Sequence, residues 1–250
     1  MAALNAGHAM ALGEAMIDAQ KGTLFGIGVG PGEAELITLK AARLIAACPV
    51  IAFLSADGKP GLARSIANHH INASQLELTV DMPMRVSRSE GQAAYDDAAT
   101  RIKSHLNAGS DVAFLCEGDP MFFGSFMYLL ARLGSDYPVE IVPGVASPMA
   151  AAAFAKAPLC AREDAFAVIP ATLDDKRIEE ILKAVDTAVI MKLGRHLPRI
   201  KALLNRVGLD ALYVERASMA GQRVLPLHKL PDDAAPYFSL LLVSRASVTQ

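Results

Sequence analysis

Short apolar runs alternate with segments of helical spacing over residues 23–144, and this alternation restricts the possible folds more than any other feature. Apolar runs of this length, bounded by turn residues, are typical of buried strands. We place them at 23–30, 50–54, 76–80, 111–116 and 139–144. The alternation predicts a mostly parallel sheet with helices on both faces, in which ligands bind at the carboxyl ends of the strands.

The second half of the chain has a different pattern. Strands are predicted at 166–170, 187–192, 211–217 and 237–243, and helices at 147–157, 174–185 and 195–207. No clear helix separates the last two strands, and prolines interrupt 221–236, which favours a mixed sheet. We therefore predict a two-domain α/β chain, with an extension at 1–21, an N-terminal domain at 22–144 and a C-terminal domain at 145–246.

Composition argues against several broad classes. The chain is 52% hydrophobic, which is too apolar for a disordered protein. Its 24 Lys and Arg against 26 Asp and Glu give no basic excess for nucleic-acid binding. Cys48, Cys116 and Cys160 are too far apart for a zinc motif, and no apolar run approaches the length of a membrane helix. The first 21 residues lack the basic start of a signal peptide, so we expect a cytoplasmic protein.

A glycine-rich turn, Gly26–Gly32, follows the first predicted strand and precedes a helix. Glycines at such a turn let the backbone approach a ligand closely, although the same sequence also fits a plain tight turn. A dinucleotide site is disfavoured, because Pro31 removes an N–H that a pyrophosphate would need. The acidic residue expected about 20 positions later, at the end of the next strand, is also missing.

Two further turns follow predicted strands. Glu117–Pro120 places a carboxylate at a turn, where Asp119 could either cap the next helix or line a cleft. Val142–Ser147 leads into an alanine-rich helix, which Ser147 could cap. Tyr95, Tyr128 and Tyr237 are interpreted as packing residues, although an aromatic ring would suit a flat ligand.

In their order and spacing, these three turns resemble those of the tetrapyrrole methylase family. The resemblance runs from Thr23 to Ser244 and implies a two-domain cytoplasmic homodimer. It also implies that S-adenosylmethionine binds in the cleft between the domains, without a metal or any nucleic-acid or membrane partner. The residues that match the family's cofactor contacts are Pro31, Glu117, Gly118, Asp119, Phe122, Ala146, Ser147, Lys192 and Ala217. Lys192 departs from the apolar residue expected there, so its charge could instead face a substrate carboxylate.

Several stretches are most similar to the branch of the family that acts in cobalamin synthesis. This implies methylation of precorrin-2 at C-20 to give precorrin-3A. Arg85, Arg88 and Arg162 are candidates to bind the substrate's carboxylates, with solvated surface charges as the alternative. No residue is predicted as a catalytic base. A cobalt-containing substrate, an RNA or protein substrate and a non-catalytic cofactor sensor remain as alternatives.

Overall fold

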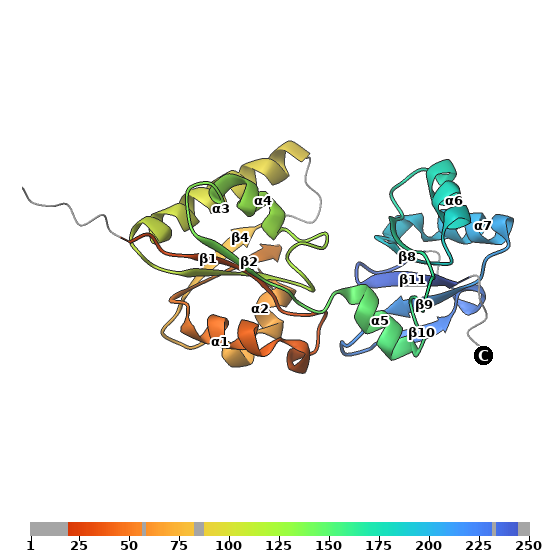
Figure 1. Cartoon of the computed structure of the whole chain (residues 1–250), viewed down its shortest axis with the longest axis horizontal. Coiled ribbons are helices and arrows are strands. Elements are labelled where there is room, and N and C mark those ends of the chain that lie inside the picture. Colours follow the sequence, from red (N-terminus) through yellow and green to blue (C-terminus); the bar gives the residue numbers. More distant parts are fainter. Residues whose placement is uncertain (1–19, 57–58, 83–87, 232–233, 245–250) are drawn as a thin grey trace, which may run out of the picture.

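The computed structural model describes residues 20–56, 59–82, 88–231 and 234–244. Most of the predicted N-terminal extension and the candidate Arg85 lie outside these residues, as does the side chain of Arg88. Two α/β lobes lie side by side, and the chain crosses between them once, ahead of α5 (Figure 1). The predicted two-domain α/β fold, with one parallel and one mixed sheet, is confirmed.

The N-terminal lobe is built on five parallel strands in the order β4-β2-β5-β1-β6. A two-residue strand, β3, pairs antiparallel with the end of β2. The strands are β1 Leu24–Gly28, β2 Val50–Ala56, β3 Lys59–Pro60, β4 Leu76–Asp81, β5 Val112–Cys116 and β6 Val139–Val142. Every residue of β1 and β5 is buried, because helices cover both faces of the sheet.

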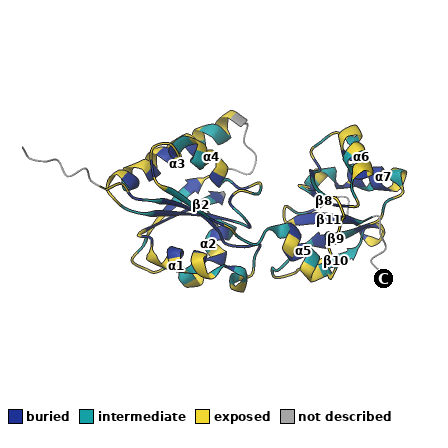
Figure 2. Cartoon of the chain, viewed as in Figure 1, coloured by how far each residue is buried: buried dark blue, intermediate teal, exposed yellow. Residues whose placement is uncertain are grey.

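Two pairs of helices enclose this sheet. α1 (Leu39–Ala47) and α2 (Leu62–Ile66) cover one face, and α3 (Arg88–Asn107) and α4 (Phe126–Leu133) cover the other (Figure 1). Short 3-10 turns lie at Ala34–Leu36 and Asn68–His70. α1 begins where the Thr38 hydroxyl accepts a hydrogen bond from the Ala41 N–H at 3.2 Å. The inward faces of the helices are buried and their outer faces exposed (Figure 2).

α4 begins later than its sequence predicts. The apolar run from Phe122 favours a helix at once, but the helix starts at Phe126. Phe123 has a φ of 55°, outside the right-handed helical region, and a side chain at Gly124 would press against the Asp119 carbonyl at 2.8 Å. The residues between Asp119 and Phe126 therefore form a compact loop at the carboxyl end of β5.

The C-terminal lobe has a five-stranded mixed sheet in the order β10-β9-β11-β8-β7, in which only β7 and β8 are parallel. Its strands are β7 Phe166–Pro170, β8 Thr187–Met191, β9 Ala211–Glu215, β10 Arg223–Pro226 and β11 Ser239–Ser244. Its helices are α5 Ser147–Ala155, α6 Asp175–Ala184 and α7 Leu197–Val207, with 3-10 turns at Gly194–His196 and Leu227–Lys229. β10 was not predicted, because it lies in the proline-containing segment.

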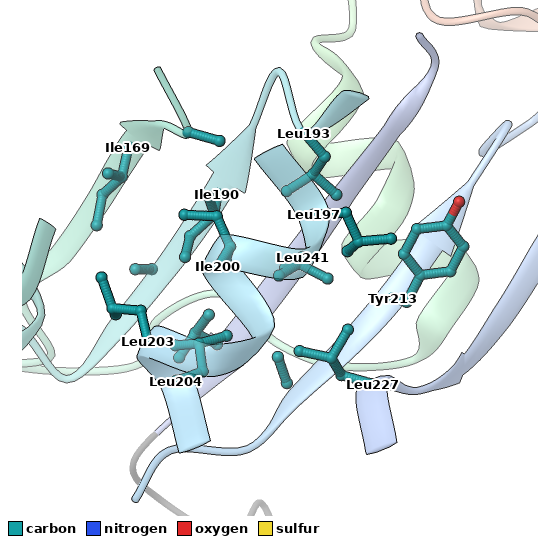
Figure 3. Close-up of a cluster of buried hydrophobic side chains, with 14 of the residues drawn as sticks. Ile169, Ile190, Leu193, Leu197, Ile200, Leu203, Leu204, Tyr213, Leu227 and Leu241 are labelled. Carbon is teal, nitrogen blue, oxygen red and sulfur yellow. The ribbon is translucent and has the colours of Figure 1, made fainter. Parts of the chain in front are cut away.

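α6 and α7 pack on one face of this sheet and α5 on the other (Figure 1). The first interface is the larger. Leu197, Ile200 and Leu203 of α7 are fully buried against Ile190 and Leu241 of the strands (Figure 3). Truncation of one such side chain to alanine typically costs about 2–5 kcal/mol of stability. This core therefore stabilises the sheet, one end of which faces the other lobe.

Candidate functional site

Three loops that are far apart in sequence meet at one edge of the N-terminal sheet. They follow β1, β5 and β6, and they come together because β1 lies between β5 and β6 in the sheet. Two backbone hydrogen bonds join the first two loops: the Gly30 N–H donates to the Gly118 carbonyl at 3.2 Å, and the Gly118 N–H donates to the Gly30 carbonyl at 2.7 Å. The predicted turns at Gly26–Gly32 and Glu117–Pro120 are thus one structural unit.

Asp119 connects the second loop to the third. One carboxylate oxygen accepts a hydrogen bond from the Met121 N–H at 2.8 Å, and the other accepts from the Gly144 N–H at 3.0 Å. Asp119 does not cap α4, because Ser125 occupies the N-cap position of that helix. Its carboxylate instead fixes the distance between the loops after β5 and β6.

Close backbone contact explains why glycine occurs in all three loops. A Cβ atom at Gly28 would lie 2.6 Å from the Gly118 carbonyl oxygen, and one at Gly144 would collide with the same oxygen. Gly118 itself has a φ of 66°, which disfavours a residue with a side chain. The loops are therefore packed backbone to backbone.

The C-terminal lobe supplies the opposite wall. Lys192 follows β8, Ala217 follows β9, and Tyr237 and Phe238 lead into β11. These residues share one end of the sheet, because β11 runs antiparallel to both β8 and β9. Together the two lobes enclose an interdomain cavity of about 200 Å³. All nine predicted cofactor residues line it: Pro31, Glu117, Gly118, Asp119, Phe122, Ala146, Ser147, Lys192 and Ala217.

Arg162 is not brought to the interdomain cavity. Its loop joins α5 to β7 and is held by a hydrogen bond from the Thr187 hydroxyl to the Leu159 carbonyl. Thr187 starts β8, whereas the cavity lies at the other end of that strand, beside Met191. Arg162, predicted as a candidate for the substrate's carboxylates, therefore lies at the end of the C-terminal sheet opposite the interdomain cavity.

A second hollow, of about 1180 Å³, lies at this opposite end of the C-terminal sheet. It is larger than the interdomain cavity, and residues such as Thr187, Asp210 and Arg206 line it. None of the predicted cofactor residues contributes to it. Because volume alone does not indicate chemistry, we place the candidate site where the loops converge.

Unusual backbone conformations also gather at the interdomain cavity. Within the described residues, six non-glycine residues have a positive φ, and four of them belong to loops of this site. These four are Phe123, Lys192, Arg216 and Ser218. Such conformations cost roughly 1–2 kcal/mol each and occur preferentially in functional sites, where the surrounding structure maintains them.

Contacts and charges extend across the cavity from one lobe to the other. The Lys192 ammonium lies 4.9 Å from the ring centroid of Phe123, which belongs to the other lobe. The Glu117 carboxylate accepts a hydrogen bond from the Ala63 N–H at 3.2 Å, so one of its oxygens is used to hold α2. Desolvation of the phenol within the cleft raises the pKa of Tyr237, and the negative charge of the nearby Glu117 raises it further. Burial raises the pKa of Cys116 to about 12, which leaves this thiol protonated at neutral pH.

Tyr237, Phe238 and Met219 line the interdomain cavity but were not predicted as site residues. The described residues between 218 and 238 contain one short strand, and the aromatic pair directly before β11 was the available indication. Within the described part of the chain, no cluster of three or more His, Cys, Asp or Glu side chains is arranged to hold a metal ion. No helix there has the length and apolar character needed to cross a bilayer.

Comparison with known families decides the classification. The model of the tetrapyrrole (corrin/porphyrin) methylases matches residues 23–231, which include all nine predicted cofactor residues but not Tyr237 or Phe238. The chain belongs to the tetrapyrrole methylases. The predicted family is confirmed over both lobes.

Individual relatives are found in cobalamin biosynthesis. The cobalamin biosynthesis protein CobIJ of Mycobacterium tuberculosis is 42% identical over 233 residues, covering 89% of this chain and 46% of that protein. The chain thus spans about half the length of the first relatives that it matches. Precorrin-2 C(20)-methyltransferase of a Sinorhizobium species is 37% identical and covers 89% of this chain and 95% of that protein. Cobalt-precorrin-2 C(20)-methyltransferase of Salmonella typhimurium is 35% identical and covers 90% and 97%.

Solved structures share the same two-lobed fold. The cobalt precorrin-4 methyltransferase CbiF superposes with a TM-score of 0.71 at 19% identity, over 89% of this chain and 94% of that one. Uroporphyrin-III C-methyl transferase of Thermus thermophilus, complexed with S-adenyl homocysteine, superposes with a TM-score of 0.65 at 25% identity, over 90% and 98%.

Proposed function

We propose that this protein is an S-adenosylmethionine-dependent methyltransferase that methylates precorrin-2 at C-20 in cobalamin biosynthesis. The observation that carries the proposal is the convergence of nine residues, from six separate positions along the chain, on one interdomain cavity. The Sinorhizobium relative matches both lobes and nearly its whole length, which supports the same substrate class here.

The residues present are suited to S-adenosylmethionine. Gly118, Ala146 and Ala217 carry little or no side chain, so the backbone there allows a ligand to approach closely along the interdomain cavity. A Cβ atom at Gly118 would meet nothing closer than 3.8 Å, so that glycine leaves room for a ligand. The volume of about 200 Å³ is below the about 300–1,000 Å³ of typical ligand pockets, so the rest of an elongated cofactor would extend along the open cleft.

S-adenosylmethionine supplies a methyl group already activated by a positively charged sulfur. The chain's own contribution is alignment: the loops after β1, β5 and β6 hold the cofactor, and the cleft directs the substrate carbon at its methyl group. Alignment of this kind can lower a barrier by about 7–11 kcal/mol. The new carbon–carbon bond forms as the methyl–sulfur bond breaks, and a proton then leaves C-20. We assign no residue as the base for that proton.

We extend the proposal to a cytoplasmic homodimer without nucleic-acid or membrane partners. The described cysteines support a reducing compartment, because Cys48 and Cys116 are buried as free thiols and Cys160 is exposed and unpaired. Dimerisation rests on the family resemblance. Light scattering after size-exclusion chromatography should give twice the chain mass, and a monomer would contradict the homodimer.

A single-turnover assay tests the reaction. The protein is mixed without oxygen with methyl-labelled S-adenosylmethionine and freshly prepared precorrin-2, with and without cobalt, and the product is located by carbon NMR. Label at C-20 of the metal-free substrate is expected. Transfer only to the cobalt form would assign the chain the Salmonella relative's substrate instead. No transfer to either would contradict the proposed function.

A further inference from the structure

Exposed apolar side chains are concentrated beside the interdomain cavity. Of the ten large apolar side chains that are exposed in the described chain, six lie in the β5–α4 loop, the first turn of α4 or the segment before β11. They are Met121, Phe123, Met127, Tyr128, Tyr237 and Phe238. Tyr237 is 74% exposed, although it also lines the cavity. Such a concentration of exposed apolar side chains beside a cavity is typical of a binding site.

The rings on this surface are held in place by neighbouring rings. Tyr128 stacks on the buried Tyr95, with centroids 4.7 Å apart and planes inclined by 26°. Tyr237 meets Phe238 edge to face, with centroids 4.9 Å apart. Phe123 of the β5–α4 loop lines the same cavity as Tyr237 and Phe238, so this loop and the segment before β11 lie close together. Rings that are already ordered lose little entropy when a flat ligand stacks on them.

The surface is continuous with the interdomain cavity and carries a positive charge at its border. Phe123, Tyr237 and Phe238 line the cavity, whereas Tyr128 does not. The Lys192 ammonium lies over the Phe123 ring, where cofactor pocket and aromatic surface meet. An apolar flat face beside a cation suits a flat ring system with carboxylates on its rim.

We propose that Tyr128, Tyr237 and Phe238 form an aromatic wall that receives the flat face of the tetrapyrrole, with Tyr237 at the junction with the cofactor. This inference rests on the proposed function and goes beyond it, because it assigns the residues that position the macrocycle. It also replaces the interpretation of Tyr128 and Tyr237 as packing residues. Tyr95 keeps a packing role, since it supports Tyr128 from the buried side.

Binding of uroporphyrin III, a stable flat tetrapyrrole with eight carboxylates, tests the wall without turnover. Fluorescence titration compares wild type with Tyr128→Leu and Tyr237→Leu, which keep apolar bulk but remove the ring. Each variant should bind the porphyrin about fivefold more weakly. Tyr237→Phe should bind it like wild type, because the ring remains. Phe154→Leu is the matched control, since Phe154 is a 37% exposed aromatic residue of α5 outside the cavity.

Calorimetry with S-adenosylhomocysteine separates a substrate wall from a structural role. Tyr128→Leu should leave this affinity within about twofold of wild type, because Tyr128 does not line the cavity. Unchanged porphyrin affinity in both leucine variants would overturn the proposed aromatic wall. Equal loss of porphyrin and S-adenosylhomocysteine binding would also overturn it, as would the absence of porphyrin binding by wild type. If wild type methylates precorrin-2 while the variants bind porphyrin normally, the wall fails and the function stands. If the wall binds porphyrin but no methyl is transferred, the function fails and the wall stands.

Discussion

Replacement of Asp119 by alanine should weaken both the N-terminal lobe and the cofactor site. The Asp119 carboxylate accepts hydrogen bonds from Met121 at 2.8 Å and Gly144 at 3.0 Å, and these join the loops after β5 and β6. Without it, two N–H groups lose a charged acceptor, and the Gly144 loop is no longer fixed against the Gly118 loop. Both loops carry residues that line the interdomain cavity.

The size of the effect follows from the type of hydrogen bond. A hydrogen bond to a charged group contributes about 1.5–3 kcal/mol, so two of them would contribute about 3–6 kcal/mol if fully shielded. Asp119 is partly exposed, and water can replace part of what is lost. We therefore expect Asp119→Ala to lower the free energy of unfolding by about 2–3 kcal/mol. Asp119→Asn should cost less, because its amide oxygen can still accept one of the two bonds.

Urea unfolding followed by circular dichroism measures this loss, since the chain has no tryptophan for fluorescence. S-adenosylhomocysteine binding is measured on the same variants by calorimetry. Asp174→Ala is the control: Asp174 caps α6 by accepting from the Arg177 N–H at 2.9 Å, and it does not line the cavity. It should cost about 1 kcal/mol and leave cofactor affinity unchanged. Wild-type stability together with wild-type affinity in Asp119→Ala would refute the reasoning.

Further predictions concern four other features. Lys192→Met should preserve S-adenosylhomocysteine affinity within about threefold but raise the KM for the tetrapyrrole in steady-state kinetics. A weaker S-adenosylhomocysteine affinity with an unchanged KM would contradict this. Replacing Arg85 and Arg88 together by alanine should likewise raise that KM alone; equal loss of cofactor binding would argue against a carboxylate role. Burial raises the pKa values of Cys48 and Cys116 to about 12, so iodoacetamide at pH 8 should label only Cys160, as mass spectrometry would show. Gly144→Ala should abolish soluble expression or cost several kcal/mol of stability, because its Cβ atom would collide with the Gly118 carbonyl, and a wild-type melting temperature would contradict this.

Apolar runs bounded by turn residues were sufficient to predict every strand of the two sheets except β3 and β10, because buried strands leave continuous apolar runs in the sequence. The strand order was not predictable from it. Pairing of β1 with both β5 and β6, which brings the three loops together, depends on contacts between residues about 90 and 115 positions apart. The turn residues predicted where each loop lies in the sequence. Only the family resemblance predicted that the three loops bind one cofactor together.

Other features depended on tertiary contacts that local sequence does not reveal. The apolar run after Met121 favours a helix, yet close packing around Gly124 delays α4 until Phe126. Arg162 follows an α-helix that begins at the cavity, but its loop lies at the far end of the sheet because α5 runs away from the site. The sequence favoured a packing role for Tyr237, whereas the structure leaves 74% of this residue exposed at the cavity.

The central claim is that the interdomain cavity is the cofactor site, and calorimetric titration with S-adenosylhomocysteine tests it most directly. Ala146 lines the cavity, whereas Ala153 is an exposed residue of the same helical region that does not. Wild type and Ala153→Phe should each bind one S-adenosylhomocysteine per chain, and Ala146→Phe should bind none, because its ring would fill the cavity. Absence of binding by wild type, or equal binding by Ala146→Phe, would contradict the account.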